Sequence, residues 1–329
     1  MITIKKTSSF DEIEELWSEL YQRNSDATYY QSPEYMRASW DNLLPYCFIL
    51  RIIPVFYVFF KEDNAIFILP LFKKILKKSY TLYGQKAGLG YLDGIYGDDI
   101  TISDIEECFE SLKKIFNGTI YFEHIKESSF LGKWLLEQGC RVSEEFYTEI
   151  PLPTSYEQYY ASLSKHMKQN IRTAYNRIKS DGLDLNFQSL DYINDSEKIR
   201  LDLQKLYIER QIIKYGKNKL YSFFVRYVDM GTKIQKNQTI KEKSFLLYIG
   251  NEIAAYYDAI YTNGKVIVPR LAIAEKFNRY SPGIILINES VKHLLAAGIE
   301  VIDLTHGNES YKLSMGGITY KCVEGVIII

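Results

Sequence analysis

The chain has 329 residues and a net charge of −1, with 47% hydrophobic and 25% charged residues. These proportions are typical of soluble globular proteins and exclude a mainly disordered chain, which needs low hydrophobicity and high net charge. At roughly 150 residues per domain, the length favours two domains.

The near-zero net charge hides an asymmetry between the two halves of the chain. Residues 1–150 carry 16 Lys and Arg against 23 Asp and Glu, whereas residues 151–329 carry 24 against 18. The basic second half is compatible with an anionic ligand there and equally with ordinary drift in composition.

Cysteine spacing and hydropathy bear on the compartment. The four cysteines show no CxxC spacing, which indicates a reducing environment and argues against a disulfide scaffold and structural zinc. The start lacks the apolar core of a signal peptide, and the apolar stretch 47–72 is broken by Lys61-Glu62-Asp63-Asn64. We therefore expect a cytoplasmic protein without a membrane span and without a metal.

Helix and strand patterns alternate along the first half. Ser9 and Glu12 resemble a capping box for the first helix, and Pro33 suits the start of the second. The segment 84–97, rich in Gly and Tyr, predicts a loop and a short strand. The expected helices span 10–23, 33–40, 103–116 and 128–138, and the expected strands span 55–60, 65–72, 118–124 and 146–150. The Pro-bounded run 151–153 then predicts a domain boundary at 150/151.

The second half predicts longer helices and a strand meander. Its first helix carries five basic and no acidic residues between 165 and 179. Hairpin turns are expected at Gly250-Asn251 and Asn263-Gly264. The expected helices span 156–180, 196–213, 219–235 and 282–297, and the expected strands span 245–249, 253–261, 265–271, 299–304 and 323–329.

The helix start at 279–284 has the chemistry of an anion site. Ser281 suits the N-cap, Pro282 suits the first turn, and Gly283 lets a ligand approach the backbone. Free N–H groups at a helix start attract phosphate, although a well-capped helix without a ligand explains most of this pattern. Pro269 cannot donate to a ladder, so the strand before this loop is expected to be bulged, unpaired or at an edge. A sheet that opens there can admit an extended pantetheine arm.

Several segments, taken in order, resemble a known family. The C-terminal part holds an SPG tripeptide in 278–286, a strand with Asp303, and Gly307-Asn308-Glu309-Ser310-Tyr311-Lys312. Upstream lie Leu163-Ser164-Lys165 with Asn170 and Arg172, then Arg210, and the FILPL strand at 67–71. Together they resemble the CelD-like branch of the GNAT acyltransferase superfamily, associated with cellulose and polysaccharide biosynthesis and related to the Fem aminoacyltransferases. The chain differs at His306, where many members have Arg, and in lacking a basic residue at 313–315.

The resemblance implies a fold and a function. The fold class is α/β (α+β), with tandem GNAT-like units that are each a mixed, mostly antiparallel sheet flanked by helices. Residues 1–150 would be a degenerate unit without an SPG-like loop, and 151–329 would bind an acyl-CoA such as acetyl-CoA. The implied enzyme is an acyltransferase that moves an acetyl or other acyl group to an amine or hydroxyl of a sugar or cell-envelope precursor.

Two alternatives stay open. One is a Fem-like transferase that uses aminoacyl-tRNA, the only reading in which a nucleic acid partner is expected. The other is a catalytically inactive GNAT-fold binding module.

Candidate catalytic residues follow from GNAT chemistry, in which an acceptor attacks the thioester directly. His306 is a candidate base because its ordinary pKa of about 6.5 suits proton transfer, and Asp258 is another because burial raises a carboxyl pKa. The resemblance implies that Tyr311 protonates the leaving thiolate or orients the acceptor, and that Lys312 stabilises negative charge near the thioester.

Candidate binding residues also follow from the resemblance. The pyrophosphate is expected on the backbone at 280–284, with a phosphate paired to Arg279 and pantetheine on the backbone of Leu271 and Ala272. The cofactor-binding set is Leu271, Ala272, Arg279, Tyr280, Ser281, Gly283 and Ile284. The acceptor-binding set is Lys165, Asn170, Arg172, Arg210, Tyr257 and Arg270.

Overall fold

The computed structural model describes residues 2–43, 47, 51–75, 77–83, 93–191, 197–215, 242–262 and 264–329. The chain divides into two compact units, one formed by Met1–Phe146 with Tyr320–Ile329 and the other by Tyr147–Thr319. The boundary expected at 150/151 lies four residues beyond this division, and the last ten residues belong to the first unit rather than the second. The expected helix 219–235 and Asn263 of the second hairpin turn lie outside the described residues.

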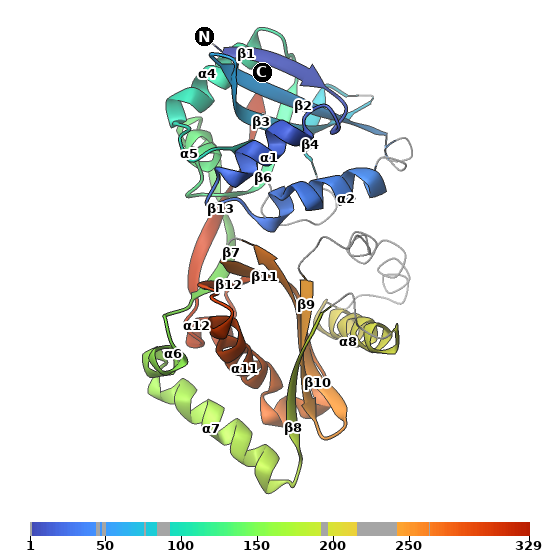
Figure 1. The fold of residues 1–329 in the computed structure, drawn as a ribbon, viewed down its shortest axis with the longest axis vertical. Helices are drawn as coiled ribbons and strands as arrows, with labels where there is room; N and C mark the ends of the chain where they lie inside the picture. Colours follow the sequence, from blue (N-terminus) through green and yellow to red (C-terminus); the bar gives the residue numbers. More distant parts are fainter. Residues whose placement is uncertain are drawn as a thin grey trace. The chain divides into compact units, whose positions relative to one another are not determined.

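The first unit is a mixed, mostly antiparallel sheet flanked by helices (Figure 1). Its strand order is β1-β2-β3-β4-β6-β13, with β5 beside β3 and a parallel pairing of β4 with β6. The strands are β1 (Ile2–Thr7), β2 (Ile52–Lys61), β3 (Asn64–Lys74), β4 (Ser79–Leu82), β5 (Ile95–Tyr96), β6 (Thr119–Lys126) and β13 (Ile318–Ile328). The helices are α1 (Glu14–Gln22), η1 (Tyr29–Gln31), α2 (Pro33–Leu43), α4 (Ile102–Lys113) and α5 (Phe130–Glu137).

The apolar run of β2 reflects burial on both faces of the sheet. Tyr57 and Phe59 join the core that includes α4 and α5, whereas Phe56 meets the rings of Phe10 and Trp40 on the other face. Successive strand residues point to opposite faces, so a strand covered on both sides is apolar throughout. The expected pair of buried strands is confirmed as β2 and β3.

The expected capping box of the first helix does not form. The Ser9 hydroxyl donates to Asp11 at 3.4 Å, and α1 begins only at Glu14 with Ile13 in the N-cap position. Because Ser9 bonds a neighbouring side chain instead of a helical N–H, the turn at 11–13 precedes the helix.

The second unit has the strand order β7-β12-β11-β10-β9-β8, antiparallel except for β11 and β12. Its strands are β7 (Arg141–Pro151) from Tyr147 onward, β8 (Leu185–Asp191), β9 (Glu242–Ile249), β10 (Glu252–Thr262), β11 (Lys265–Ile273) and β12 (Val301–His306). Its helices are α6 (Tyr156–Ser162), α7 (Lys165–Ser180), α8 (Glu197–Tyr215), η5 (Glu275–Tyr280), α11 (Pro282–Ala296) and α12 (Ser310–Ser314). The mixed, mostly antiparallel architecture with flanking helices is therefore confirmed in both units.

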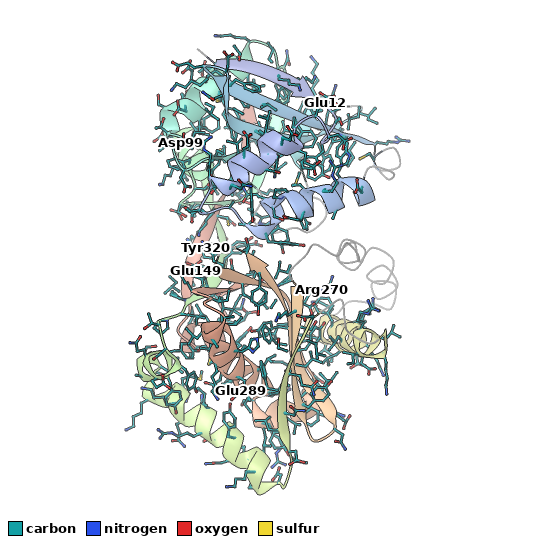
Figure 2. The ribbon with its side chains drawn as sticks, in the orientation of Figure 1. Glu12, Asp99, Glu149, Arg270, Glu289 and Tyr320 are labelled. Carbon is teal, nitrogen blue, oxygen red and sulfur yellow. The ribbon has the colours of Figure 1, made fainter. Side chains whose placement is uncertain are left out.

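Helices cover both faces of this sheet, with α7 and α11 on one side and α8 on the other (Figure 1). Phe245 and Tyr257 pack in the core with α11, whereas Leu246 and Tyr256 pack against Leu203 of α8. Glu289 of α11, labelled in Figure 2, accepts a hydrogen bond from the Tyr175 hydroxyl of α7. Among the described residues, no helix is long and apolar enough to cross a membrane.

The single helix expected over 156–180 is two helices. Leu163 takes an extended conformation with ψ of 148°, and the Ser164 hydroxyl accepts from the Met167 N–H at 3.1 Å. Ser164 is thus the N-cap of α7, and Lys168 donates to the Ala161 carbonyl at 2.7 Å near the end of α6. The helical periodicity continues across the break, so periodicity alone does not reveal it.

A half-buried carboxyl in the first unit should make stability depend on pH. Burial raises the pKa of Asp93 to about 7, although its carboxylate accepts from the Gly94 N–H at 2.7 Å and the Tyr96 hydroxyl at 3.0 Å. In an unfolded chain the pKa is about 3.9, so the folded protein binds this proton more tightly. The resulting stabilisation is complete below about pH 4 and is lost as the pH rises to about 7.

We therefore expect Asp93→Asn to flatten the urea-unfolding free energy between pH 4 and pH 7, where the wild type should lose on the order of 2–4 kcal/mol. The matched control is Asp99→Asn, which removes an exposed ion pair to Arg23 and should keep the pH dependence. An unchanged slope in Asp93→Asn would show that other groups carry it.

Candidate functional site

The sheet of the second unit opens between β11 and β12. Their parallel register runs from Lys265↔Val301 to Ile267↔Asp303. The pairing of β10 with β11 shifts between Asp258 and Ile260, opposite Val268 and Pro269, so β11 carries a bulge there. The irregularity expected at Pro269 is confirmed, and it lies where the described part of β11 departs from β12.

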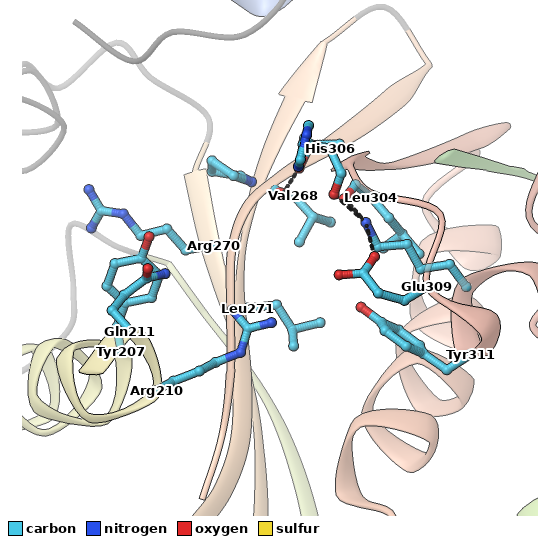
Figure 3. A pocket seen from close by; sticks show the side chains of 13 residues that line it. Tyr207, Arg210, Gln211, Val268, Arg270, Leu271, Leu304, His306, Glu309 and Tyr311 are labelled. Carbon is cyan, nitrogen blue, oxygen red and sulfur yellow. Dashed lines mark hydrogen bonds and ion pairs between the residues drawn. The ribbon is translucent and has the colours of Figure 1, made fainter. Parts of the chain in front are cut away.

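A pocket of about 170 Å³ lies at this opening (Figure 3). The face of α8, the bulged part of β11, the end of β12 and the residues around α12 contribute to it. Its lining residues are Tyr207, Arg210, Gln211, Val268, Pro269, Arg270, Leu271, Leu304, Thr305, His306, Glu309, Tyr311 and Lys312. The pocket therefore gathers two guanidinium groups, an imidazole, two phenols and an ion pair.

The end of β12 is a sharp turn. Thr305 and Gly307 have φ angles of 57° and 101°, in the left-handed region that a β-branched residue rarely adopts. The Thr305 N–H donates to the Asp303 carboxylate at 2.7 Å, and its hydroxyl donates to the Val268 carbonyl of β11 at 3.3 Å. This turn leaves the His306 side chain exposed, with its ring edge-on to Tyr147 at 5.6 Å.

Lys312 reaches the same turn from α12. Only 3% of the residue is exposed, and its ammonium donates to the carbonyls of Leu304, His306 and Gly307 at 3.0, 2.6 and 3.2 Å. The Glu309 carboxylate lies 3.1 Å from the same nitrogen. The ammonium is thus directed at backbone oxygens and one carboxylate.

Tyr311 is held in its protonated form. Burial, together with the negative charge of Glu309, raises its pKa to about 12, and the positive charge of Arg210 acts in the opposite direction. A phenol with this pKa keeps its proton at neutral pH and can donate a hydrogen bond.

Arg270 of β11 and Asp258 of β10 are paired positions on neighbouring strands, but only Arg270 lines the pocket. Arg270 lines the pocket with its guanidinium over the Tyr207 ring at 5.7 Å. Asp258 is 4% exposed and accepts from the Ser244 hydroxyl at 3.1 Å, and it is not among the lining residues. Tyr257 is 1% exposed, and its burial against the α11 side raises its pKa, so it too lies away from the pocket.

The start of α11 departs from the expected cap. Ser281 occupies the N-cap position, and its carbonyl accepts from the N–H groups of Ile284 and Ile285 at 3.0 and 3.3 Å. Its φ of 51° is left-handed, and its side chain makes no capping bond. A Cβ on Gly283 would lie 2.7 Å from the end of the Ile273 side chain, so a larger residue here would displace that side chain of β11.

Arg279 and Tyr280 contact the end of α7. The Arg279 guanidinium lies 2.9 Å from the Asp181 carboxylate, which also accepts from the Tyr280 hydroxyl at 2.6 Å and thereby raises the pKa of that phenol. Arg177 donates to the Arg279 carbonyl at 2.8 Å. These contacts anchor η5 to α7.

The remaining candidates separate into two groups. Ala272 is fully buried on the α8 face, and Leu271 lines the pocket. Lys165, Asn170 and Arg172 lie on α7, with Lys165 and Arg172 exposed, and they do not line the pocket. The structure thus brings together His306, Tyr311, Lys312, Arg210, Arg270 and Leu271 in one pocket.

Sequence reasoning missed several lining residues. On α8, Tyr207 stands three residues before Arg210, and Gln211 stands directly after it. The available signal was the four-residue spacing of Tyr207 and Gln211, which places two side chains on the same side of a helix. Glu309 stands three residues before Lys312, which is the spacing of a helical ion pair. Among the described residues, no group of three or more His, Cys, Asp or Glu side chains could hold a metal ion.

Comparison with protein families finds one match within this unit. Residues 236–313 match the model described as the Acetyltransferase (GNAT) domain, which spans β9 to α12 and includes much of the pocket. No curated protein sequence matches the chain significantly.

Solved structures share the fold over nearly the whole chain. The C-terminal domain of a putative lysylphosphatidylglycerol synthetase from Agrobacterium fabrum is 12% identical, with a TM-score of 0.56 and coverage of 97% of this chain and 92% of that one. A tandem GNAT protein from the clavulanic acid biosynthesis pathway is 10% identical, with a TM-score of 0.53 and coverage of 100% and 98%. FemX is 11% identical, with a TM-score of 0.50 and coverage of 99% and 97%. The fold is that of tandem GNAT proteins, and the domain match together with this fold supports an acyltransferase.

Proposed function

We propose that this protein transfers an acyl group from an acyl-CoA, with acetyl-CoA the simplest case, to an amine or hydroxyl of an acceptor that carries an anionic group. The observation that carries the proposal is the pocket at the opening between β11 and β12. The resemblance to the CelD-like branch favours a sugar or cell-envelope precursor as the acceptor.

The acyl donor is proposed to lie along the opened edge of β11. The register between β11 and β12 ends at Ile267, whereas β11 pairs with β10 further along, at residues that include Leu271 and Ala272. On the side of these residues that faces β12, the backbone groups lie outside the β11–β12 register. Those groups are suited to hydrogen-bond a pantetheine arm. The chain then continues through η5 to α11, whose first turn at 281–284, with Arg279 and Tyr280 beside it, is the proposed pyrophosphate site.

The chemistry is a direct transfer with the acceptor in the α8 side of the pocket. The acceptor nitrogen or oxygen attacks the thioester carbon, the C–S bond breaks, and the acceptor proton leaves to a base for which His306 is the pocket candidate. Tyr311, protonated at neutral pH, gives its proton to the departing thiolate and regains one from water. Arg210 and Arg270 are proposed to hold the anionic group of the acceptor.

Thermal unfolding with CoA and with acetyl-CoA tests the donor. Saturation at about 100 times the Kd should raise the Tm by about 5 °C or more. Leu271→Trp fills the opening and should abolish the shift, whereas Leu201→Trp, at an exposed position of α8, should keep it. Release of CoA thiol in the presence of amino sugars and nucleotide-linked sugars then identifies the acceptor class.

A second candidate is a Fem-like transferase that uses aminoacyl-tRNA. The observation that favours it is the exposed face of α7, where Lys165, Arg172 and Lys179 stand without an acidic residue in the helix. A folded protein that shows no Tm shift at millimolar acetyl-CoA would contradict the acyl-CoA proposal. Retention of aminoacyl-tRNA in a gel-shift assay would then support the second candidate.

A further inference from the structure

The turn at the end of β12 needs a stabilising partner. Thr305, a β-branched residue, has a φ of 57°, an unfavourable conformation that persists only where surrounding contacts hold it. The turn also directs several carbonyls to one side, where Lys312 and the Thr148 hydroxyl donate to them. Unless such carbonyls are paired, their burial is unfavourable.

The Lys312 ammonium matches this arrangement. It has three N–H donors, and three carbonyls lie within 2.6–3.2 Å of its nitrogen. The Glu309 carboxylate at 3.1 Å balances its charge, and the side chain is 4% exposed. A buried ammonium is tolerated only with such partners, so these contacts form a built cation site.

The backbone around Lys312 is itself anchored. The Gly317 N–H donates to the Lys312 carbonyl at 3.0 Å, and a Cβ on Gly317 would lie 2.7 Å from that carbonyl. The Lys312 N–H donates to the Glu309 carbonyl at 2.9 Å. The five-residue helix α12 therefore presents the ammonium at a defined place beneath the turn.

We propose that Lys312 is a positioning residue whose ammonium holds the strained turn 304–307 in the shape that faces His306 into the pocket. The role differs from charge stabilisation at the thioester, because the donors of this ammonium are directed at carbonyl oxygens of the turn. The inference rests on the proposed function only in what the position of His306 is for, because the position of the turn can be measured without substrate.

The experiment replaces Lys312 by alanine and supplies a cation from solution. The matched control is Lys292→Met, which also removes a lysine paired with a glutamate three residues earlier, but on the exposed face of α11. The first readout is the Tm without ligand, expected to fall by about 5–10 °C in Lys312→Ala and little in the control. The second is the NMR signal of the His306 ring, assigned by its loss in His306→Gln.

The His306 signal reports the turn directly. Its ring lies edge-on to Tyr147, so a displaced turn changes the ring-current shift. Methylammonium chloride should restore both the Tm and the His306 signal of Lys312→Ala, because methylammonium has three N–H donors for the vacated carbonyls. Tetramethylammonium chloride at the same concentration has no donors and should restore neither.

The outcomes are separable from those of the proposed function. A His306 signal and Tm at wild-type values in Lys312→Ala overturn the positioning role, whether or not acetyl-CoA binds. If Lys312→Ala does not fold in buffer, it is refolded in methylammonium chloride and in tetramethylammonium chloride. Equal recovery of folded protein in the two salts also overturns the positioning role. Absence of acetyl-CoA binding by the wild type contradicts the proposed function and leaves these readouts intact.

Discussion

Tyr311→Phe is expected to lower kcat for acyl transfer by about 100-fold, with little change in the KM of either substrate. The phenol lies in the pocket with a pKa raised to about 12, so it carries its proton at every pH at which the enzyme would be assayed. Phenylalanine keeps the ring and removes the proton donor. The loss should therefore fall on the step in which the thiolate departs.

The rate of CoA thiol release, measured with the best acceptor from the sugar panel, checks this expectation. Tyr160→Phe is a suitable control, because it removes a phenol from α6 that packs against the core outside the pocket. Because the pKa of Tyr311 is about 12, the wild type should show no activity loss from this group below about pH 11. A fall in kcat below tenfold would remove Tyr311 from the proposed chemistry.

Arg210→Met should raise the KM of the acceptor by about 100-fold and leave the Kd of acetyl-CoA unchanged. Truncating a charged partner of a bound anion costs about 2–5 kcal/mol, and each 1.4 kcal/mol is tenfold in affinity. Arg210 lies close enough to Tyr311 to influence its pKa, so its charge acts near the phenol that the proposed chemistry uses (Figure 3).

Two further variants make this result specific. Arg210→Lys keeps the charge but lacks the planar fork of donors, so it should fall between wild type and Arg210→Met. Lys205→Met removes an exposed cation from the same helix and should have no effect. An acceptor KM that is equal in Arg210→Met and wild type would contradict an anionic subsite at α8.

Patterns that repeat along the chain predicted the fold well. The apolar strands at 55–60 and 65–72 and the helix after Pro33 appear as β2, β3 and α2 because burial and proline geometry are local properties. The strands β1, β4 and β8 and the helix α12 were not predicted. β4 and α12 have only four and five residues, and β1 and β8 bury few of their side chains, so none of them shows a clear apolar period. The break at Leu163 was missed because the buried stripe continues on both sides of it.

The site was predictable as a set of residue types but not as an arrangement. Pro269 marked the opening of the sheet, because a residue without an N–H donor interrupts regular strand pairing wherever it stands. The separation of Arg210 and Arg270 from the α7 cations depends on which face of the sheet each helix covers, and no local pattern encodes that (Figure 1). The contacts of Lys312 depend on backbone carbonyls, which sequence reasoning about side chains does not consider.

The position of β13 in the chain has a consequence for folding during synthesis. Between Cys322 and Ile328 it pairs with β6, within the segment Tyr320–Ile329 that completes the first unit, yet this segment is translated after the whole of Tyr147–Thr319. At about 5–20 residues per second, the ribosome needs roughly ten to thirty seconds to make that intervening segment. During this time β6 presents an unpaired edge, the feature through which nascent chains aggregate or recruit chaperones. The N-terminal half therefore emerges first but is the last to be finished.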